Sequence, residues 1–140
     1  MAERDVLFRI GEQEYGLDVQ VVTAIEPMMD IVPVPNAPEC VLGLMNLRGE
    51  VIPVYSLRKR FQLEEYIDKD KMKLIVAKYD EKPIAFKVDE VLEMHDFADD
   101  TLSATPVIAR NSRTAYVRSV ANKEGKLVLL LEPGAMYEGD

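Results

Sequence analysis

Short segments of alternating apolar and polar residues, repeatedly interrupted by glycine and proline, limit what this chain can fold into. Tyr15, Leu17 and Val19 alternate with small or polar residues, which gives the two-residue period of a strand with one buried face. Further short apolar segments predict strands at residues 6–10, 51–57, 74–79, 84–88, 116–120 and 127–131. Pro53 lies inside one of them and indicates an edge strand or a bulge. The sequence therefore predicts a mainly β fold with little helix.

The segments between these strands predict connectors, loops and two short helical stretches. Residues 19–25 fit one helical turn, which Pro27 would end. Ser56 can accept a backbone N–H and so cap a short helix over residues 57–63. Residues 31–38 contain prolines at positions 33, 35 and 38 and are expected to be an extended connector or an edge. The expected loops are residues 64–73 and 99–113.

The two halves of the chain resemble each other. A constant shift aligns Arg9 with Lys78, Glu12 with Glu81, Leu17 with Phe86, Val19 with Val88, Val22 with Val91 and Ile25 with Met94. A slightly larger shift aligns Asn46 with Asn122, Gly49 with Gly125 and Val51 with Leu127. About five short strands per half predict two small closed barrels, because closure removes exposed sheet edges. Each would be too small to stand alone, so the barrels are expected to share an interface and form a groove.

Composition and charge argue against several classes of function. The 140 residues carry a net charge of −8, so phosphate backbones would be repelled and nucleic-acid binding is not expected. The basic run at residues 58–60 is too short to reverse this and is expected to be a solvated face. No apolar run approaches the roughly 18 residues needed to cross a bilayer, so direct membrane insertion is not expected. The lack of a signal peptide and the single cysteine favour the cytoplasm.

An enzymatic or metal-binding function has little support in the sequence. His95 is the single histidine, and although Asp96, Asp99 and Asp100 follow it, their spacing fits neither a calcium loop nor a zinc site. Cys40 has no histidine near it in sequence, so nucleophilic catalysis is not expected. Walker and GxGxxG nucleotide loops are absent. We expect a non-enzymatic protein without metal or cofactor, and a small-ligand-binding β-barrel stays open as an alternative.

The segment from Gly43 to Arg60, GLMNLRGEVIPVYSLRKR, is the most informative part of the chain. It places Arg48 between an apolar run and a glycine turn, which suits gripping another protein better than chemistry. The chain resembles the CheW family of bacterial chemotaxis adaptors over nearly its whole length. The resemblance rests on Asn46-Leu47-Arg48-Gly49 with Val51, Pro53 and Val54 after it, and on Val34-Pro35, Pro38, Leu57-Arg58, Phe61 and the stretch from Val88 to Met94.

This resemblance implies a fold and a function. The fold would be two intertwined five-stranded SH3-like β-barrels within a single CheW-like domain over residues 1–140. The approximate subdomains would be residues 14–73 and 74–140, and the strand at residues 5–10 could cross into the second barrel. The function would be a scaffold that links the regulatory domain of the histidine kinase CheA to the cytoplasmic tips of methyl-accepting chemotaxis receptors.

The resemblance also implies two binding surfaces. The residues carried over to receptor binding are Val22, Gly43, Asn46, Leu47 and Arg48. Val22 would offer apolar area, Gly43 would allow a receptor helix to approach the backbone, and Arg48 would bind acidic or carbonyl groups. The residues carried over to kinase binding are Ile84, Val91 and Met94, and the flexible thioether of methionine suits an adaptable interface.

Two departures from the family pattern affect the predicted receptor site. Ala24 stands where the family commonly has a glutamate, which removes the usual carboxylate partner of Arg48, although Glu26 is close enough in sequence to replace it. Ser56 stands where the family commonly has an aspartate, which keeps a helix cap but removes a charge. These changes leave open a paralogous CheW-like adaptor that serves another signalling pathway.

Overall fold

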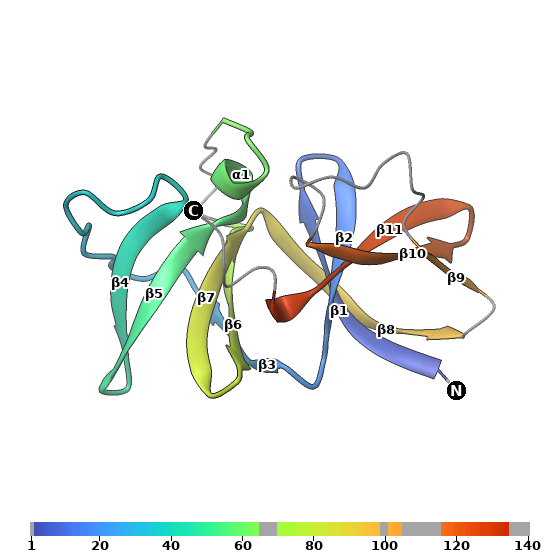
Figure 1. The fold of residues 1–140 in the computed structure, drawn as a ribbon, viewed down its shortest axis with the longest axis horizontal. Helices are drawn as coiled ribbons and strands as arrows, with labels where there is room; N and C mark the ends of the chain where they lie inside the picture. The colour runs from blue at the N-terminus through green and yellow to red at the C-terminus, as the bar shows by residue number, and fades with distance from the viewer. Residues whose placement is uncertain (1, 65–69, 99–100, 105–115, 135–140) are drawn as a thin grey trace.

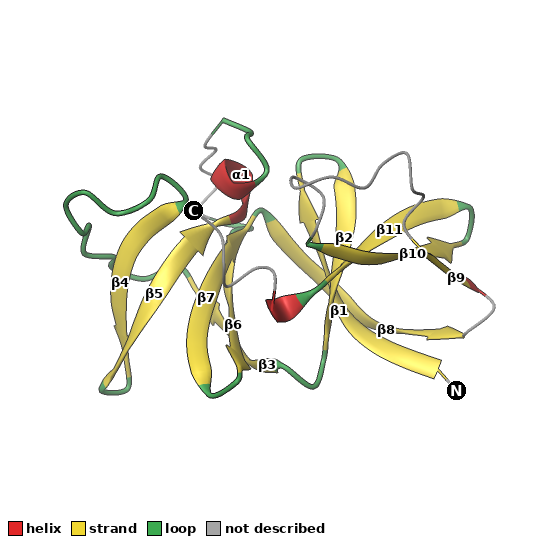
Figure 2. Ribbon diagram, viewed as in Figure 1, coloured by secondary structure: helices red, strands yellow, loops and turns green. Residues whose placement is uncertain are grey.

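The structure, a computed structural model, describes residues 2–64, 70–98, 101–104 and 116–134. Within these residues the chain forms mainly strands, together with the short helix α1 and a helical turn at residues 133–134 after the last strand, and none of the described helices is long and apolar enough to span a membrane (Figures 1 and 2). The elements are β1 (Ala2–Ile10), β2 (Gln13–Asp18), β3 (Val22–Pro27), β4 (Val41–Leu47), β5 (Glu50–Ser56), α1 (Leu57–Arg60), β6 (Lys73–Tyr79), β7 (Lys82–Val88), β8 (Glu90–Ala98), β9 (Leu102–Ala104), β10 (Val117–Lys123) and β11 (Lys126–Leu131).

The strands form two curved sheets that lie side by side (Figure 1). Barrel 1 denotes the five-stranded sheet in the order β3-β6-β7-β5-β4, and barrel 2 the six-stranded sheet in the order β8-β1-β2-β11-β10-β9. The predicted fold class, mainly β with two intertwined SH3-like barrels and little helix, is confirmed. The one addition is the three-residue strand β9, which pairs with β10 at the edge of barrel 2.

The two halves of the sequence exchange their first hairpins. The hairpin β1–β2 belongs to the sheet that the second half builds, and the hairpin β6–β7 belongs to the sheet that the first half builds. Replacing β6, β7, β3, β5 and β4 by their repeat partners β1, β2, β8, β11 and β10 converts the strand order of barrel 1 into that of barrel 2. Strand pairing therefore divides the chain differently from the expected subdomains 14–73 and 74–140, because the repeat boundary lies inside barrel 1.

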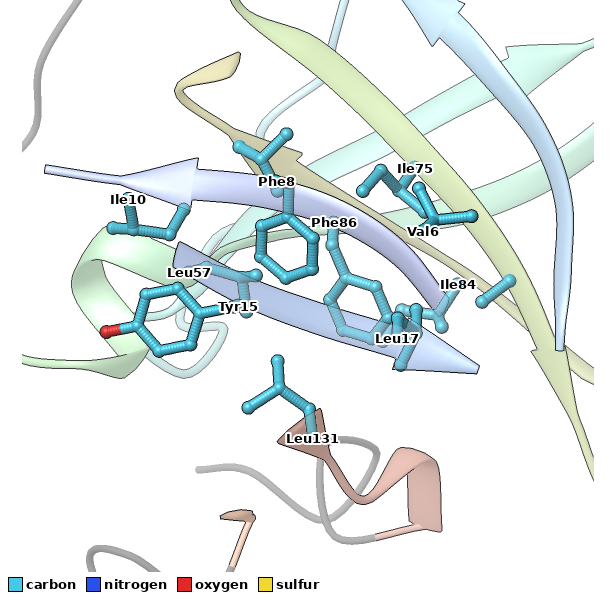
Figure 3. Close-up of a cluster of buried hydrophobic side chains, with 12 residues drawn as sticks. Val6, Phe8, Ile10, Tyr15, Leu17, Leu57, Ile75, Ile84, Phe86 and Leu131 are labelled. Atoms are coloured by element: carbon cyan, nitrogen blue, oxygen red, sulfur yellow. The ribbon is translucent and has the colours of Figure 1, made fainter. Parts of the chain in front are cut away.

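This exchange explains how two small sheets share one core. The central core cluster combines Val6, Phe8 and Ile10 of β1 with Ile84, Phe86 and Val88 of β7, and Leu57 and Leu131 close it (Figure 3). On the opposite faces of these strands, Leu7 enters the interior of barrel 2 and Ala85 the interior of barrel 1. Successive side chains of a strand point to opposite faces, so a strand buried on both sides contributes to two cores. The prediction of a shared interface between the barrels is confirmed.

Two local predictions are corrected by the structure. Residues 19–25 do not form a helical turn, because residues 22–27 form the edge strand β3, which pairs with β6. The β-branched Val22, Thr23 and Ile25 favour an extended backbone over a helix. The predicted helix at residues 57–63 is shorter, ending at Arg60, but its cap is confirmed, since the Lys59 N–H donates to Ser56 Oγ at 3.2 Å.

The predicted loops lie partly outside the described residues. In residues 99–113, the described part forms strand β9, and the remainder lies outside the described residues. In residues 64–73, positions 65–69 lie outside them, and Lys73 already begins β6. The predicted strand at residues 116–120 corresponds to β10, which starts at Val117.

Candidate functional site

The β4–β5 hairpin fixes the position of Arg48. Its two-residue loop consists of Arg48 with a φ of 52° and Gly49 with a φ of 89°, the two positive values of a type I′ turn. The Gly49 N–H donates to Asn46 Oδ1 at 2.9 Å and closes the turn. Asn46 therefore shapes the turn whether or not it also contacts a partner. A tight hydrogen-bonded turn holds the backbone of Arg48 rigidly at the tip of barrel 1.

The Arg48 side chain projects into solvent and is held by one carboxylate. Its side chain is 74% exposed, and its Nη1 lies 3.2 Å from Oε2 of Glu26, whose side chain is only 14% exposed. Ala24 and Glu26 lie two residues apart on β3 and therefore face the same side of the strand. The carboxylate that the family resemblance leads one to expect at the position of Ala24 is supplied here by Glu26. The remaining guanidinium donors face outward, where an acceptor on another protein can reach them.

A hollow of about 320 Å³ lies beside Arg48, at one end of barrel 1. It is lined by Thr23, Ala24, Leu47, Arg48, Glu50, Ile52, Val76, Lys78 and Pro83. Leu47 packs against the interior core of barrel 1 and also faces this hollow. The structure therefore brings Leu47, Arg48 and Glu26 together at one surface, with both apolar area and charge.

The other two residues of the predicted receptor surface have structural roles. Val22 is half-buried and packs against the central core. Gly43 is buried, and a Cβ added to it would lie 2.1 Å from the carbonyl oxygen of Val32. The close approach that requires glycine is therefore made by the chain's own Val32, which forms a bridge to Leu44. The expectation that a receptor helix approaches the backbone at Gly43 has no open surface to support it.

The predicted kinase surface is divided between the core and the exterior. Ile84 is 1% exposed and lies in the central core, so its side chain packs against the chain's own residues and not at the exterior. Val91 is half-buried and packs against the same core. Met94 is 60% exposed on β8, opposite Val6 of β1. In sequence, Ile84 is apolar like Val91 and Met94 and looks equivalent to them. It differs from them in the structure because β7, unlike β8, is buried on both faces.

Exposed apolar residues occur at equivalent positions in both barrels, and of these only Met94 was predicted to lie on a binding surface. Val51 in barrel 1 and Leu127 in barrel 2 are 60% and 58% exposed, and each follows the glycine turn of its hairpin. Ile25 on β3 and Met94 on β8 are likewise exposed on edge strands. The internal repeat aligned both pairs and could have revealed them. Each barrel therefore presents its own apolar surface.

The acidic residues near His95 form a structural contact. The His95 ring packs against Phe97 with ring centroids 4.5 Å apart. Asp96 pairs with Arg4 at 2.7 Å, and hydrogen bonds from this guanidinium lower the pKa of the Asp96 carboxyl. Asp99 and Asp100 lie outside the described residues. Across residues 2–64, 70–98, 101–104 and 116–134, no three His, Cys, Asp or Glu side chains come together as a metal site.

Comparison with known proteins identifies the family. The model of the CheW-like domain family matches residues 5–139. The chemotaxis protein CheW of Thermotoga maritima is 32% identical over 140 residues, covering 99% of this chain and 90% of that protein. The CheW protein of Rhizobium meliloti is 28% identical, covering 96% and 87%. The crystal structure of scaffolding protein TtCheW from Thermoanaerobacter tengcongensis superimposes with a TM-score of 0.91 at 26% identity, covering 100% of this chain and 95% of that one. This chain belongs to the CheW-like family.

Proposed function

We propose that this protein is a non-enzymatic scaffold that couples methyl-accepting chemotaxis receptors to the histidine kinase CheA. Membership of the CheW-like family supports the chemotaxis role, and the similar TtCheW is described as a scaffolding protein. The single observation that carries the proposal is the presence of separate exposed contact surfaces: Arg48 with its hollow on barrel 1 and Met94 on the edge of barrel 2. A scaffold needs two such surfaces that can be occupied together.

The receptor surface comprises Leu47, Arg48 and the adjoining hollow. Glu26 limits the motion of the guanidinium, so less side-chain entropy is lost when a receptor binds. The planar fork of Arg48 can hold two oxygen acceptors in one orientation, which a lysine cannot. Asn46 belongs to this surface as the residue that closes the turn, and Val22 and Gly43 support it from within the fold.

The kinase surface is centred on Met94, with the half-buried Val91 beside it on β8. β8 is an edge strand of barrel 2, so its outer side is not covered by another strand of the described chain. A homologous barrel in the regulatory domain of CheA would bury the apolar area of Met94, which contributes roughly 1.5–3 kcal/mol for full burial of a side chain of this size. Because the two partners act inside the cell, the scaffold operates in the cytoplasm and reaches the membrane through receptors.

Coupling follows from holding both partners at once. In an ordered array, modest contacts at each surface gain avidity because the second contact forms within the same assembly. A receptor state changes kinase activity when it binds the scaffold with a different free energy from the other state. The rigid shared core between the barrels can transmit such a change in seating, since packed cores deform little.

The proposal is tested by co-sedimentation with purified CheA and a receptor cytoplasmic fragment. Arg48→Glu is expected to weaken receptor binding about tenfold or more, which corresponds to about 1.4 kcal/mol. Its melting temperature should change little, because an exposed ion pair contributes at most about 1 kcal/mol. The control Arg48→Lys keeps the charge but loses the planar guanidinium, so its receptor affinity should lie between those of the wild-type protein and Arg48→Glu. Loss of CheA binding and of thermal stability together with receptor binding would contradict the assignment.

The kinase surface is tested in the same assay with Met94→Asp. This change places a charge on the predicted contact and is expected to weaken CheA binding while receptor binding is retained. Calorimetry with CheA measures the affinity directly, and an unchanged affinity would remove Met94 from the kinase surface. Failure of the wild-type protein to bind both partners simultaneously would contradict the scaffold itself.

A paralogous adaptor of another signalling pathway is the second candidate. The observation that favours it is Ala24, because the carboxylate that pairs with Arg48 is displaced by two residues along β3. Binding to receptor fragments of different classes discriminates between the candidates. A chemotaxis scaffold binds the methyl-accepting class, whereas a paralogue prefers another.

A further inference from the structure

Helix α1 ends in three basic residues that have different surroundings. Arg58 is largely buried and donates to both carboxylate oxygens of Asp89, with the shortest contact at 2.7 Å. In contrast, neither Lys59 nor Arg60 forms an ion pair with any residue that the structure describes, although both are half-buried. The basic run is therefore not the solvated face expected from the sequence. Among the described residues, two of its three cations therefore have no counter-charge.

The Arg60 guanidinium is fixed against an aromatic ring. Its Cζ lies 5.6 Å from the centroid of the Tyr116 ring, a cation–π arrangement. That ring stacks on Phe61, which stacks in turn on Tyr15, with centroid separations of 4.8 and 5.0 Å. The Arg60 Nε–H is buried and has no acceptor within the described chain. A buried N–H without an acceptor is unfavourable, so an acceptor that reached this N–H would stabilise the arrangement.

Lys59 and Arg60 both line one hollow. It has a volume of about 530 Å³ and is lined by Glu39, Cys40, Lys59, Arg60, Gln62, Leu63 and Glu64. The two carboxylates, Glu39 and Glu64, are exposed, and neither forms an ion pair with Lys59 or Arg60 among the described residues. The half-buried part of the hollow is therefore positively charged, although the whole protein carries a net charge of −8. The Arg48 surface uses none of these residues.

We propose that this hollow is a binding site for an oxyanion, a phosphate or carboxylate group held by Arg60 and Lys59. A guanidinium can donate to two oxygens of such a group at once, and an ammonium adds a second charge. A small rotation of the Arg60 side chain supplies its Nε–H with the acceptor it lacks. Because Arg60 belongs to α1 of barrel 1 and Tyr116 precedes β10 of barrel 2, the anion binds where the two barrels meet.

The site is tested with inorganic phosphate and, separately, acetate as probes. The ¹⁵N-labelled protein is titrated at constant ionic strength with chloride as the balancing anion, and the arginine Nε–Hε signals are followed by NMR. The Arg60 signal, assigned from its absence in Arg60→Met, is expected to shift with a saturating curve. Lys59→Met should weaken binding at least threefold. Methionine keeps an apolar stem over Tyr116, and a thermal melt checks that each variant folds.

Arg48 supplies the internal control, because it is an exposed arginine outside the hollow. Its Nε–Hε signal should shift weakly and without saturation. If the Arg48 and Arg60 signals respond alike, or if neither responds, no specific site exists and the proposal is overturned. Binding of both probes with unchanged CheA and receptor binding in Arg60→Met identifies a free anion as the ligand. Weakened binding of either protein in Arg60→Met identifies a carboxylate or phosphate carried by that partner. The NMR titration itself does not depend on the scaffold function, so the anion site and the scaffold proposal can fail separately.

Discussion

The equivalent hairpins of the two barrels have the same backbone geometry but carry different side chains at their tips. The β4–β5 and β10–β11 hairpins have the same two-residue turn, in which Arg48 and Glu124 both have a φ of 52° and are followed by Gly49 and Gly125. In each turn an asparagine Oδ1 accepts the glycine N–H at 2.9 Å. The turn geometry thus belongs to the repeat, whereas the charge at its tip is opposite in the two barrels. Arg48 gains its role from its side chain and its neighbours and not from an unusual backbone.

The barrels also differ where a further segment covers the hairpin. In barrel 2, β9 pairs with β10 over three residues, so that Val120 lies opposite Ser103. In barrel 1, a single bridge joins Val32 to Leu44 at the equivalent position. There the Val32 backbone approaches so closely that position 43 must be glycine, while the equivalent position of barrel 2 holds Ser119. The same framework therefore tolerates a side chain in one barrel and excludes it in the other.

The largest expected effect follows from this difference. Gly43→Ser gives barrel 1 the residue that barrel 2 carries, but its Cβ would overlap the Val32 carbonyl, and its φ of 151° would be strained. We expect the free energy of unfolding to fall by about 3 kcal/mol. Urea denaturation measures this loss. The reverse change in barrel 2, Ser119→Gly, should cost about 1 kcal/mol. Equal losses in the two variants would show that Val32 does not determine the requirement for glycine.

The two crossings of the chain between the barrels provide a second comparison. The first, between β2 and β3, is held by Asp18, whose carboxylate accepts the Gln20 N–H at 2.8 Å on the surface. The second, between β7 and β8, is the single residue Asp89, which accepts hydrogen bonds from Arg58 and from the Gly11 N–H. Burial raises the pKa of Asp89, but these hydrogen bonds outweigh it and the pKa is lowered overall. The second crossing is therefore the more strongly fixed.

Asp89→Asn is expected to reduce the free energy of unfolding by about 2 kcal/mol at neutral pH, since Arg58 loses its counter-charge. Because the folded pKa of Asp89 lies below its value in the unfolded chain, the carboxylate stabilises the fold above about pH 4. That stabilisation is lost as the pH falls through the folded pKa. Denaturation curves of the two proteins should converge in acid. Asp18→Asn is the control, with a loss of about 1 kcal/mol; a pH-independent difference for Asp89→Asn would exclude its ionisation as the cause.

Much of the fold could be predicted because the internal repeat and the alternation of apolar and polar residues independently indicate the same strands. The pairs Asn46–Gly49 and Asn122–Gly125 correctly indicated equivalent hairpins. The division of strands between barrels could not be predicted, since hairpin exchange changes which strands pair but not the local pattern of either strand. The prediction of a helical turn at residues 19–25 was wrong, because apolar residues three apart fit a short helix as well as an edge strand.

The candidate site was only partly predictable for a related reason. Sequence patterns distinguish a strand face that is apolar, but not whether that face meets solvent or a second sheet. Ile84 and Met94 are both apolar strand residues, yet one lies in the shared core and the other on the surface. The prediction that Glu26 could replace the missing carboxylate as the partner of Arg48 is confirmed. A shift of two residues along a strand keeps the side chain on the same face.

The smallest expected change tests whether the charge at a tip is enough. Glu124→Arg places an arginine on the barrel 2 turn, but the repeat puts His95 where barrel 1 has Glu26, and Glu93, which stands where barrel 1 has Ala24, already pairs with Lys123 at 3.3 Å. Glu124 is exposed, and the free energy of unfolding should change by less than about 0.5 kcal/mol. In the double variant Arg48→Glu with Glu124→Arg, receptor co-sedimentation should stay as weak as in Arg48→Glu alone. Recovery of binding would mean that the receptor reads charge on a turn of this shape, and that Glu26 and the hollow beside Arg48 contribute nothing to recognition.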